Sequence, residues 1–197
     1  MQTQEKIAEG SDGTRKASRD LPGVRLESRR LTTAEAECLH QELKSTPNIL
    51  GYTVPELLRF ADVRVALATD DSGGDETFAG ACLVKDLRWD WTEISVVYVL
   101  PAFRGRGISS RLFETAFADA QSRRRHVFTL SRSPEVIHLM KRLGMETTGA
   151  AWKAPMAVHL EMNWHMMSRY RWSEASRKMK MRKADGYEFL AGMKRFP

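Results

Sequence analysis

The chain has 197 residues, of which 42% are hydrophobic, and a formal net charge of +6, which suits one domain with a full core and short extensions. No stretch is long and apolar enough to cross a bilayer, and the N-terminus has no apolar signal-peptide core, so we expect a cytoplasmic protein with no membrane partner. In that reducing compartment Cys38 and Cys82 should be free thiols. The histidines show no metal-ligand spacing, so no metal is expected.

Composition divides the chain into three regions. Residues 1–22 are polar, without apolar periodicity, and are expected to be disordered or an added arm. Residues 23–164 carry the periodic segments of one domain. Residues 165–197 hold nine basic against three acidic residues, so the excess positive charge lies in a C-terminal extension that is largely helical by pattern.

Capping residues and hydrophobic periodicity predict the elements of the middle region in order. Thr32 with Glu35, and Thr53 with Glu56, are capping boxes that open two helices. The other predicted elements are strands at 24–26, 63–69, 78–84 and 94–100, a helix at 108–120, a strand at 126–130 and a helix at 133–143.

The section from 146 to 164 is ambiguous between helix and strand, and its apolar residues decide the prediction. They alternate strictly with other residues, which is period two and predicts a strand at 156–164, paired with 146–152 through a turn. Residues 166–183 read as a helix, and the remainder is expected to be a short capping segment. The alternating apolar residues are Met156, Val158, Leu160, Met162 and Trp164.

The central unit is the strand at 94–100, the turn at 101–107 and the helix at 108–120. The first amides of a helix lack partners and carry the positive end of the helix dipole. Gly105 and Gly107 permit unusual φ angles and let a phosphate approach the backbone. The unit is therefore expected to bind an anion, and the alternative is a tight turn with two solvated arginines. The spacing excludes a P-loop and is a poor dinucleotide fingerprint.

The segment 97–109, V-Y-V-L-P-A-F-R-G-R-G-I-S, resembles the acyl-CoA-binding motif of the GNAT superfamily of N-acetyltransferases. The family pattern is Gln/Arg-x-x-Gly-x-Gly/Ala. Arg104, Gly107 and Ser109 take its three defined places. Ser109 departs from the pattern, but its hydroxyl is small and able to bond a phosphate itself.

Residues 133–145 resemble the second block of the same family, with Ser133 at the usual Asn place and Met140 at the usual Tyr place. The resemblance spans roughly residues 24–164 and implies acetyl-CoA as the acyl donor. The implied fold is α/β (α+β): a mixed, mostly antiparallel sheet of six to seven strands, splayed between strands 4 and 5, with helices on both faces. The CoA-binding residues implied are Val97, Tyr98, Val99, Arg104, Gly105, Arg106, Gly107, Ile108, Ser109, Ser133 and Met140.

Acyl transfer to an amine needs a base for the amine proton and an acid for the leaving thiolate. Glu93 is the candidate base, because several GNAT enzymes use a strand glutamate in this context; a solvated strand-end carboxylate is the alternative. Asp86 and Asp90 are reserves. Met140 cannot donate a proton. Tyr98 is the candidate acid, with core packing as its alternative; otherwise the thiolate takes its proton from water, or the enzyme is slow or inactive.

The resemblance predicts an N-acyltransferase that moves an acetyl or short acyl group to a primary amine of a small molecule or protein. A catalytically degenerate CoA-binding protein is the first alternative. Tyr52, Trp89 and Trp91 are candidate walls of the acceptor site. The basic tail suggests a nucleic-acid or acidic partner, against a solvated helix face or a homodimer contact.

Overall fold

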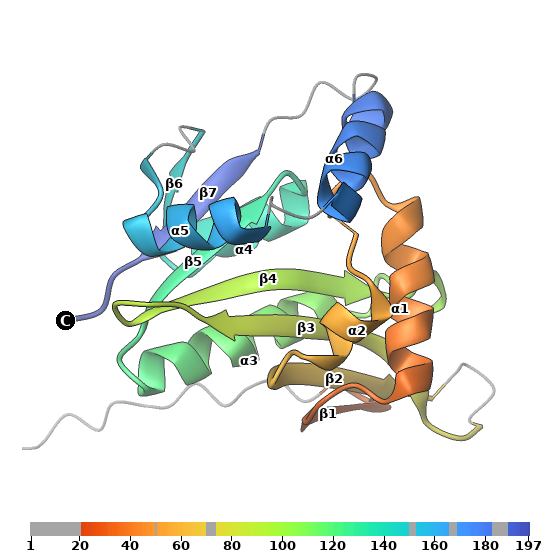
Figure 1. The fold of residues 1–197 in the computed structure, drawn as a ribbon. Helices are drawn as coiled ribbons and strands as arrows, with labels where there is room; N and C mark the ends of the chain where they lie inside the picture. The colour runs from red at the N-terminus through yellow and green to blue at the C-terminus, as the bar shows by residue number, and fades with distance from the viewer. Residues whose placement is uncertain (1–20, 50, 70–73, 150–152, 166–168, 183–188) are drawn as a thin grey trace, which may run out of the picture.

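The computed structural model describes residues 21–49, 51–69, 74–149, 153–165, 169–182 and 189–197. Within these residues seven strands form one sheet, in the order β1-β2-β3-β4-β5-β7-β6 (Figure 1). The strands are β1 (Val24–Ser28), β2 (Asp62–Ala68), β3 (Thr77–Asp86), β4 (Trp91–Val99), β5 (His126–Ser131), β6 (Glu146–Thr148) and β7 (Leu190–Lys194).

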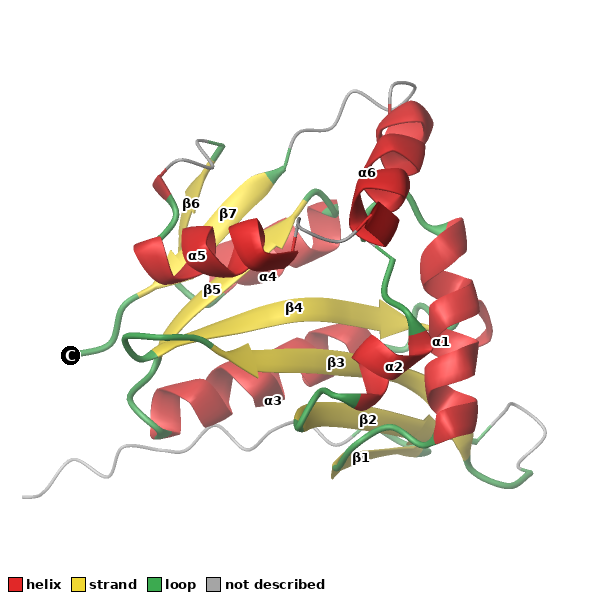
Figure 2. Ribbon diagram, viewed as in Figure 1, coloured by secondary structure: helices red, strands yellow, loops and turns green. Residues whose placement is uncertain are grey.

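Helices cover both faces of the sheet (Figure 2). They are α1 (Thr33–Ser45), α2 (Val54–Leu58), α3 (Ile108–Ser122), α4 (Pro134–Arg142), α5 (Met156–His165) and α6 (Arg169–Arg182). In the view of Figure 1, α1, α2 and α5 lie in front of the sheet and α3 lies behind it. Neighbouring strands pair antiparallel except β4 and β5, which are parallel. The predicted fold class is confirmed.

Local sequence signals account for the helix boundaries. The Thr32 amide donates to the Glu35 carboxylate over 2.8 Å, while the Thr32 hydroxyl accepts from the Glu35 amide over 3.3 Å. Thr53 and Glu56 form the same reciprocal box at the start of α2. Both predicted capping boxes are confirmed. The apolar residues of the predicted central helix all face inward in α3, as Ile108, Leu112, Phe113, Ala116, Phe117 and Ala120.

The core has a main layer on each side of the sheet. Behind it, α3 and α4 pack through Phe113 and Met140 against Ile94 and its neighbours. In front, α1 and α2 pack through Leu39 and Leu57 against strand residues of β2, β3 and β4. β4 therefore contributes to both layers, which explains its near-continuous apolar run.

The sheet opens between β4 and β5. Their parallel pairing covers residues 91–93 of β4 against residues 126–128 of β5. Just beyond it, the register of β3 and β4 shifts at Leu83 and Val84, and such bulges bend a strand. The Thr129 hydroxyl donates to the Ile94 carbonyl over 2.9 Å at the start of the gap. β4 continues to Val99 along β3 alone.

Two predictions about the end of the chain are wrong. Residues 156–164 form α5 rather than a strand. The adjacent Ala157 and Val158 are both buried, whereas Met156 and Leu160 are exposed, and this burial does not follow a period of two. Helix-favouring residue types dominate this stretch.

The partner of β6 is β7, a strand in the stretch expected to be a capping segment. Residues 165–197, expected as a basic extension, thus contribute one strand to the sheet. The expected helix over 166–183 appears as α6, with 166–168 and 183 outside the described residues. Most of the expected N-terminal arm, residues 1–20, also lies outside them.

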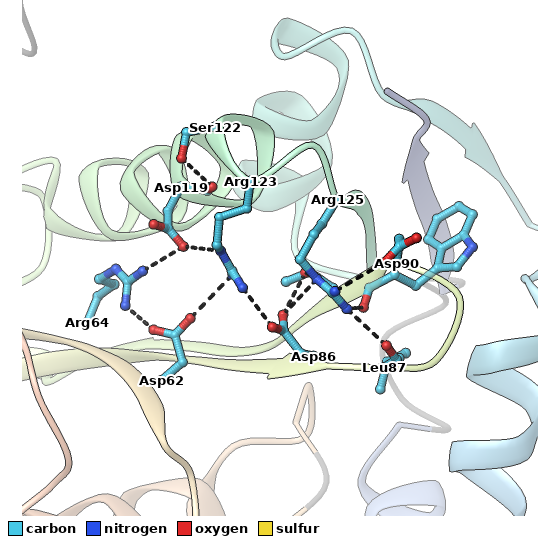
Figure 3. Close-up of polar contacts among 11 residues, drawn as sticks. Asp62, Arg64, Asp86, Leu87, Asp90, Asp119, Ser122, Arg123 and Arg125 are labelled. Atoms are coloured by element: carbon cyan, nitrogen blue, oxygen red, sulfur yellow. Dashed lines mark hydrogen bonds and ion pairs between the residues drawn. The ribbon is translucent and has the colours of Figure 1, made fainter. Parts of the chain in front are cut away.

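An ionic network joins β2, β3 and α3 on the end of the sheet opposite the β4–α3 turn (Figure 3). Arg123 lies among three carboxylates, at 2.6 Å from Asp86, 3.0 Å from Asp119 and 3.7 Å from Asp62. Arg64 extends the network to Asp119 over 3.1 Å. These carboxylates are about a third exposed or more, so each pair adds little stability by itself, and the network serves mainly to fix geometry.

Arg125 is more buried than Arg123 and lies beside the β4–β5 pairing. Its Nη2 donates to the carbonyls of Leu87 and Trp91, over 2.9 and 2.7 Å, and its Nε donates to the Thr92 hydroxyl over 2.9 Å. The residue directly precedes β5, so these bonds fasten the start of β5 to the β3–β4 turn (Figure 3).

We expect Arg125→Met to lower the free energy of unfolding by about 2 kcal/mol, because the Leu87 carbonyl and the Thr92 hydroxyl lose a charged donor. Chemical denaturation of both proteins measures the difference. Arg124→Met is the control, since Arg124 is an exposed neighbour. Equal losses in the two variants would contradict a specific role for Arg125.

Gly80 in β3 is required by the close approach of β4. A Cβ at this position would lie 2.3 Å from the Tyr98 carbonyl oxygen and 2.9 Å from the Val99 Cα, which are backbone atoms that cannot turn aside. We expect Gly80→Ala to destabilise the fold by about 3 kcal/mol in denaturation experiments. Gly149→Ala, whose Cβ would meet Leu190 at 3.7 Å and no other residue that the structure describes, should be nearly neutral. Similar stabilities of the two variants would refute the packing argument.

Candidate active site

A cavity of about 1260 Å³ occupies the opening between β4 and β5. It runs from the start of β4 to the first turn of α3, with walls from the α1–α2 segment, α5 and α6. Most of the site residues expected from the sequence line it together. They are Glu93, Val97, Tyr98, Val99, Arg104, Gly105, Gly107, Ile108, Ser109 and Ser133.

The turn before α3 presents a row of backbone donors. Gly105 and Gly107 both have φ of +78°, a conformation that costs other residues energy. Gly107 is the N-cap of α3 and provides no capping side chain. Within the described parts of the chain, the amides from Gly105 to Ser109 donate to no protein acceptor. They can therefore receive an anion at the positive end of the helix.

The β4 edge facing the gap offers further backbone groups. The Leu100 amide donates to Ala79 on the β3 side, over 2.8 Å. Backbone direction alternates along a strand, so Val97 and Val99 turn their amides and carbonyls toward the gap. The Val99 carbonyl accepts from Arg104 Nε over 3.1 Å. An extended amide-containing chain could pair with this edge as an added strand.

Two expected site residues are not brought to the cavity. Arg106 turns away, donating from Nη1 to the Thr69 carbonyl over 3.0 Å, and its guanidinium lies over the Phe103 ring. Met140 is fully buried under β7, where a Cβ on Gly192 would lie 2.8 Å from its sulfur. Its position on the inner face of α4 makes it a core residue.

Glu93 lies partly buried at the inner end of the cavity. Burial raises the pKa of its carboxyl above the ordinary range, and the nearby Glu161 carboxylate adds to the rise. The charges of Lys85 and Arg171 and the Ser95 hydroxyl act in the opposite direction without cancelling it. A carboxylate with a raised pKa is a better proton acceptor than a solvated one, as a general base requires.

The Tyr98 hydroxyl is already bonded on both sides. It donates to the Glu42 carboxylate over 2.6 Å and accepts from Arg104 Nη2 over 3.1 Å. Burial, followed by the bond to Glu42, raises the pKa of Tyr98 to about 12. The phenol is therefore protonated near neutral pH, with its proton directed at Glu42.

The sequence analysis missed the part of the cavity formed by α5 and α6. Glu161 from α5 and Arg171, Ala175 and Met179 from α6 all line it. The alternating pattern of 156–164 predicts a strand, and a strand there would not place Glu161 or α6 at the cavity. Of the three aromatic walls expected for the acceptor, Tyr52 lines the cavity, while Trp89 is exposed and Trp91 is buried elsewhere.

Two basic residues of α6, Lys178 and Arg177, bind backbone carbonyls at the end of α1. Lys178 is fully buried, and its ammonium donates to the carbonyls of Leu43, Lys44 and Thr46 at the end of α1. A cation at a helix C-terminus satisfies the last carbonyls and the negative end of the dipole. Arg177 donates to the Lys44 carbonyl over 2.9 Å. The Lys178 ammonium is therefore occupied by the protein's own carbonyls.

We expect Lys178→Met to cost about 3 kcal/mol of unfolding free energy, because it leaves three carbonyls without their charged donor. Thermal and chemical denaturation measure the loss. Lys180→Met, an exposed position on the same helix, is the matched control. If the two substitutions have equal effects, Lys178 does not fasten α6 to α1.

The sequence profile of the acetyltransferase (GNAT) family matches residues 32–145. This match contains β4, the glycine turn and α3, which form the open edge and the donor row described above. The chain belongs to the GNAT acetyltransferase family. No curated protein sequence matches it closely enough to count as a relative.

Several solved structures share the GNAT fold. N-acetylglutamate synthase from Neisseria gonorrhoeae, complexed with coenzyme A and N-acetyl-glutamate, has a TM-score of 0.56 at 15% identity, over 86% of this chain and 35% of that chain. Rv2747 from Mycobacterium tuberculosis, in complex with CoA, has a TM-score of 0.56 at 21% identity, over 84% of this chain and 97% of that chain. Ard1 from Thermoplasma volcanium has a TM-score of 0.51 at 17% identity, over 64% of this chain and 84% of that chain. At such identities the likeness shows the fold.

In the part of the chain that the structure describes, no helix combines the length and apolarity that a membrane span needs. Among the same residues, no group of three or more His, Cys, Asp or Glu side chains is arranged to hold a metal ion.

Proposed function

We propose that this protein transfers an acetyl or other short acyl group from acyl-CoA to a primary amine. The observation that carries the proposal is the continuous cavity from Glu93, along the open edge of β4, to the free amides of Gly105–Ser109. The donor's diphosphate suits these amides, and its pantetheine amides suit the edge at Val97 and Val99. Neighbouring folds solved with CoA support the same donor.

The chain's own residues supply binding and proton transfer, while acyl-CoA supplies the thioester. Glu93 takes a proton from the amine, directly or through water, and the amine nitrogen bonds to the acyl carbon. The carbon–sulfur bond breaks, and CoA leaves as the thiol after protonation from Tyr98 or water. Backbone amides near Val97–Val99 polarise the thioester carbonyl.

The test is acetyl-CoA turnover over a panel of primary amines, followed by thiol release and by mass spectrometry of the products. We expect acetylated amine and free CoA in equal amounts. CoA binding without turnover would instead favour a degenerate CoA-binding protein, an alternative that the core position of Met140 and the bonded Tyr98 hydroxyl keep open. Absence of CoA binding would refute both.

A further inference from the structure

A pair of helices interrupts the last two strands of the sheet. β6 and β7 are antiparallel neighbours, and Thr148 pairs with Ala191. A tight turn would be enough to join them. The chain instead inserts α5 and α6 between these strands, and both helices line the cavity. Figure 1 shows α6 beside one end of α1 and α5 across β5.

Buried polar contacts fasten α6 in place. Arg171 is buried, stacks on Tyr52 with 4.1 Å between its Cζ and the ring centroid, and donates to the Gly51 carbonyl over 3.1 Å. Lys178 binds the end of α1 in the same way. These contacts join α6 to the α1–α2 segment. They close the side of the cavity that this segment lines, near the end that holds Glu93.

Packing and an ion pair fasten α5. Ala157 and Val158 belong to a buried cluster with Phe128 of β5. On the next turn of α5, Glu161 forms an ion pair with Lys85, the residue that pairs with Glu93 across β3 and β4. The two helices therefore form a roof over the end of the cavity that holds Glu93.

The roofed space has a net negative character and apolar walls. Glu161 pairs with Lys85, and Arg171 pairs with Glu56 over 3.2 Å. In the described residues, Glu93 has no ion-pair partner, although it lines the same space. The nearby walls include Ile49, Val158 and Met179. A carboxylate that forms no direct ion pair and lies beside apolar side chains suits a small ammonium ion with an apolar body.

We propose that the acceptor is a small apolar amine, bound under α5 and α6 with its nitrogen between Glu93 and Glu161, and that a lysine or N-terminus presented by a protein chain is excluded. This inference rests on the proposed acyl transfer. It adds that the inserted helices, which line the cavity together with Glu93, restrict the acceptor by size.

The test compares phenethylamine and hexylamine with an eight-residue peptide that carries a free N-terminus and one lysine. We expect kcat/KM for the better small amine to exceed that for the peptide by about 100-fold. Ala175→Phe fills the roofed space and should lower kcat/KM for the small amines by about tenfold or more, with the Kd of CoA unchanged. Ser176→Phe, on the exposed side of the same helix, is the control.

The outcomes separate the two proposals. Failure of CoA to bind in calorimetry would refute the acyl transfer itself. CoA binding with equal or faster acetylation of the peptide, or with acetylation of other primary amines but of neither of these acceptors, would refute only the small apolar amine. If Ala175→Phe does not fold, Glu161→Gln replaces it: the KM for the amine should rise about tenfold and the KM for acetyl-CoA should not change. An unchanged amine KM would overturn the assignment.

Discussion

Glu93→Gln should lower kcat for acyl transfer by about 100-fold or more, the contribution expected of a general base. The amide keeps the shape of the carboxylate but cannot take a proton from the amine. Glu93 lies at the opposite end of the cavity from the glycine turn, so the Kd of CoA should stay the same. Steady-state kinetics with a saturating amine, together with calorimetry, measure both quantities.

The pH dependence of kcat tests the role of the Glu93 carboxyl independently. Burial raises the pKa of Glu93, and the base works only when deprotonated, so activity should be lost as pH falls through this raised pKa. Lys85 lowers the pKa of Glu93, so Lys85→Met should move the acid limb of kcat to higher pH. Glu146→Gln, on an exposed position of β6, is the control. A Glu93→Gln enzyme with nearly normal kcat would exclude Glu93 as the base.

Gly107→Glu should weaken CoA binding by about 100-fold or more, since it adds a negative charge beside the proposed diphosphate position and strains the backbone. Gly107 has φ of +78° and lines the cavity. Calorimetric titration with CoA measures the change. Gly107→Ala imposes the strain without the charge and should give an intermediate Kd.

A matched control separates local strain from loss of the anion site. Gly144 has a similar φ of +67° but lies after α4, near the Lys194 ammonium and outside the cavity. Gly144→Glu should therefore bind CoA like the unmodified protein. If Gly107→Glu also does so, the turn before α3 does not hold the diphosphate.

The parts of the fold that could be predicted from the sequence are those determined by residues close together in the chain. Thr32 and Glu35 are three residues apart, so their reciprocal bonds follow from local geometry. The turn at Gly105 and Gly107 is equally local, and its φ angles follow from glycine. This local turn also carries the family resemblance, and the resemblance predicts the splayed sheet.

The parts that sequence reasoning missed depend on distant contacts. β7 is short and contains Gly192, whose lack of a side chain is explained by Met140 and Met145, which pack against it from distant parts of the chain. The apolar alternation in 156–164 satisfied a strand pattern, yet α5 buries Val158 by packing it onto Phe128 of β5. Without α5 and α6, Glu161 and Arg171 could not be assigned to the cavity.

The central claim is that an open edge of β4 and the amides before α3 hold the acyl donor. Hydrogen exchange of individual amides, measured by NMR with and without CoA, tests it most directly. We predict slower exchange at Val97, Val99 and the amides from Gly105 to Ser109 when CoA is present. CoA that binds but leaves these amides unchanged, or that protects a different region, would contradict the claim.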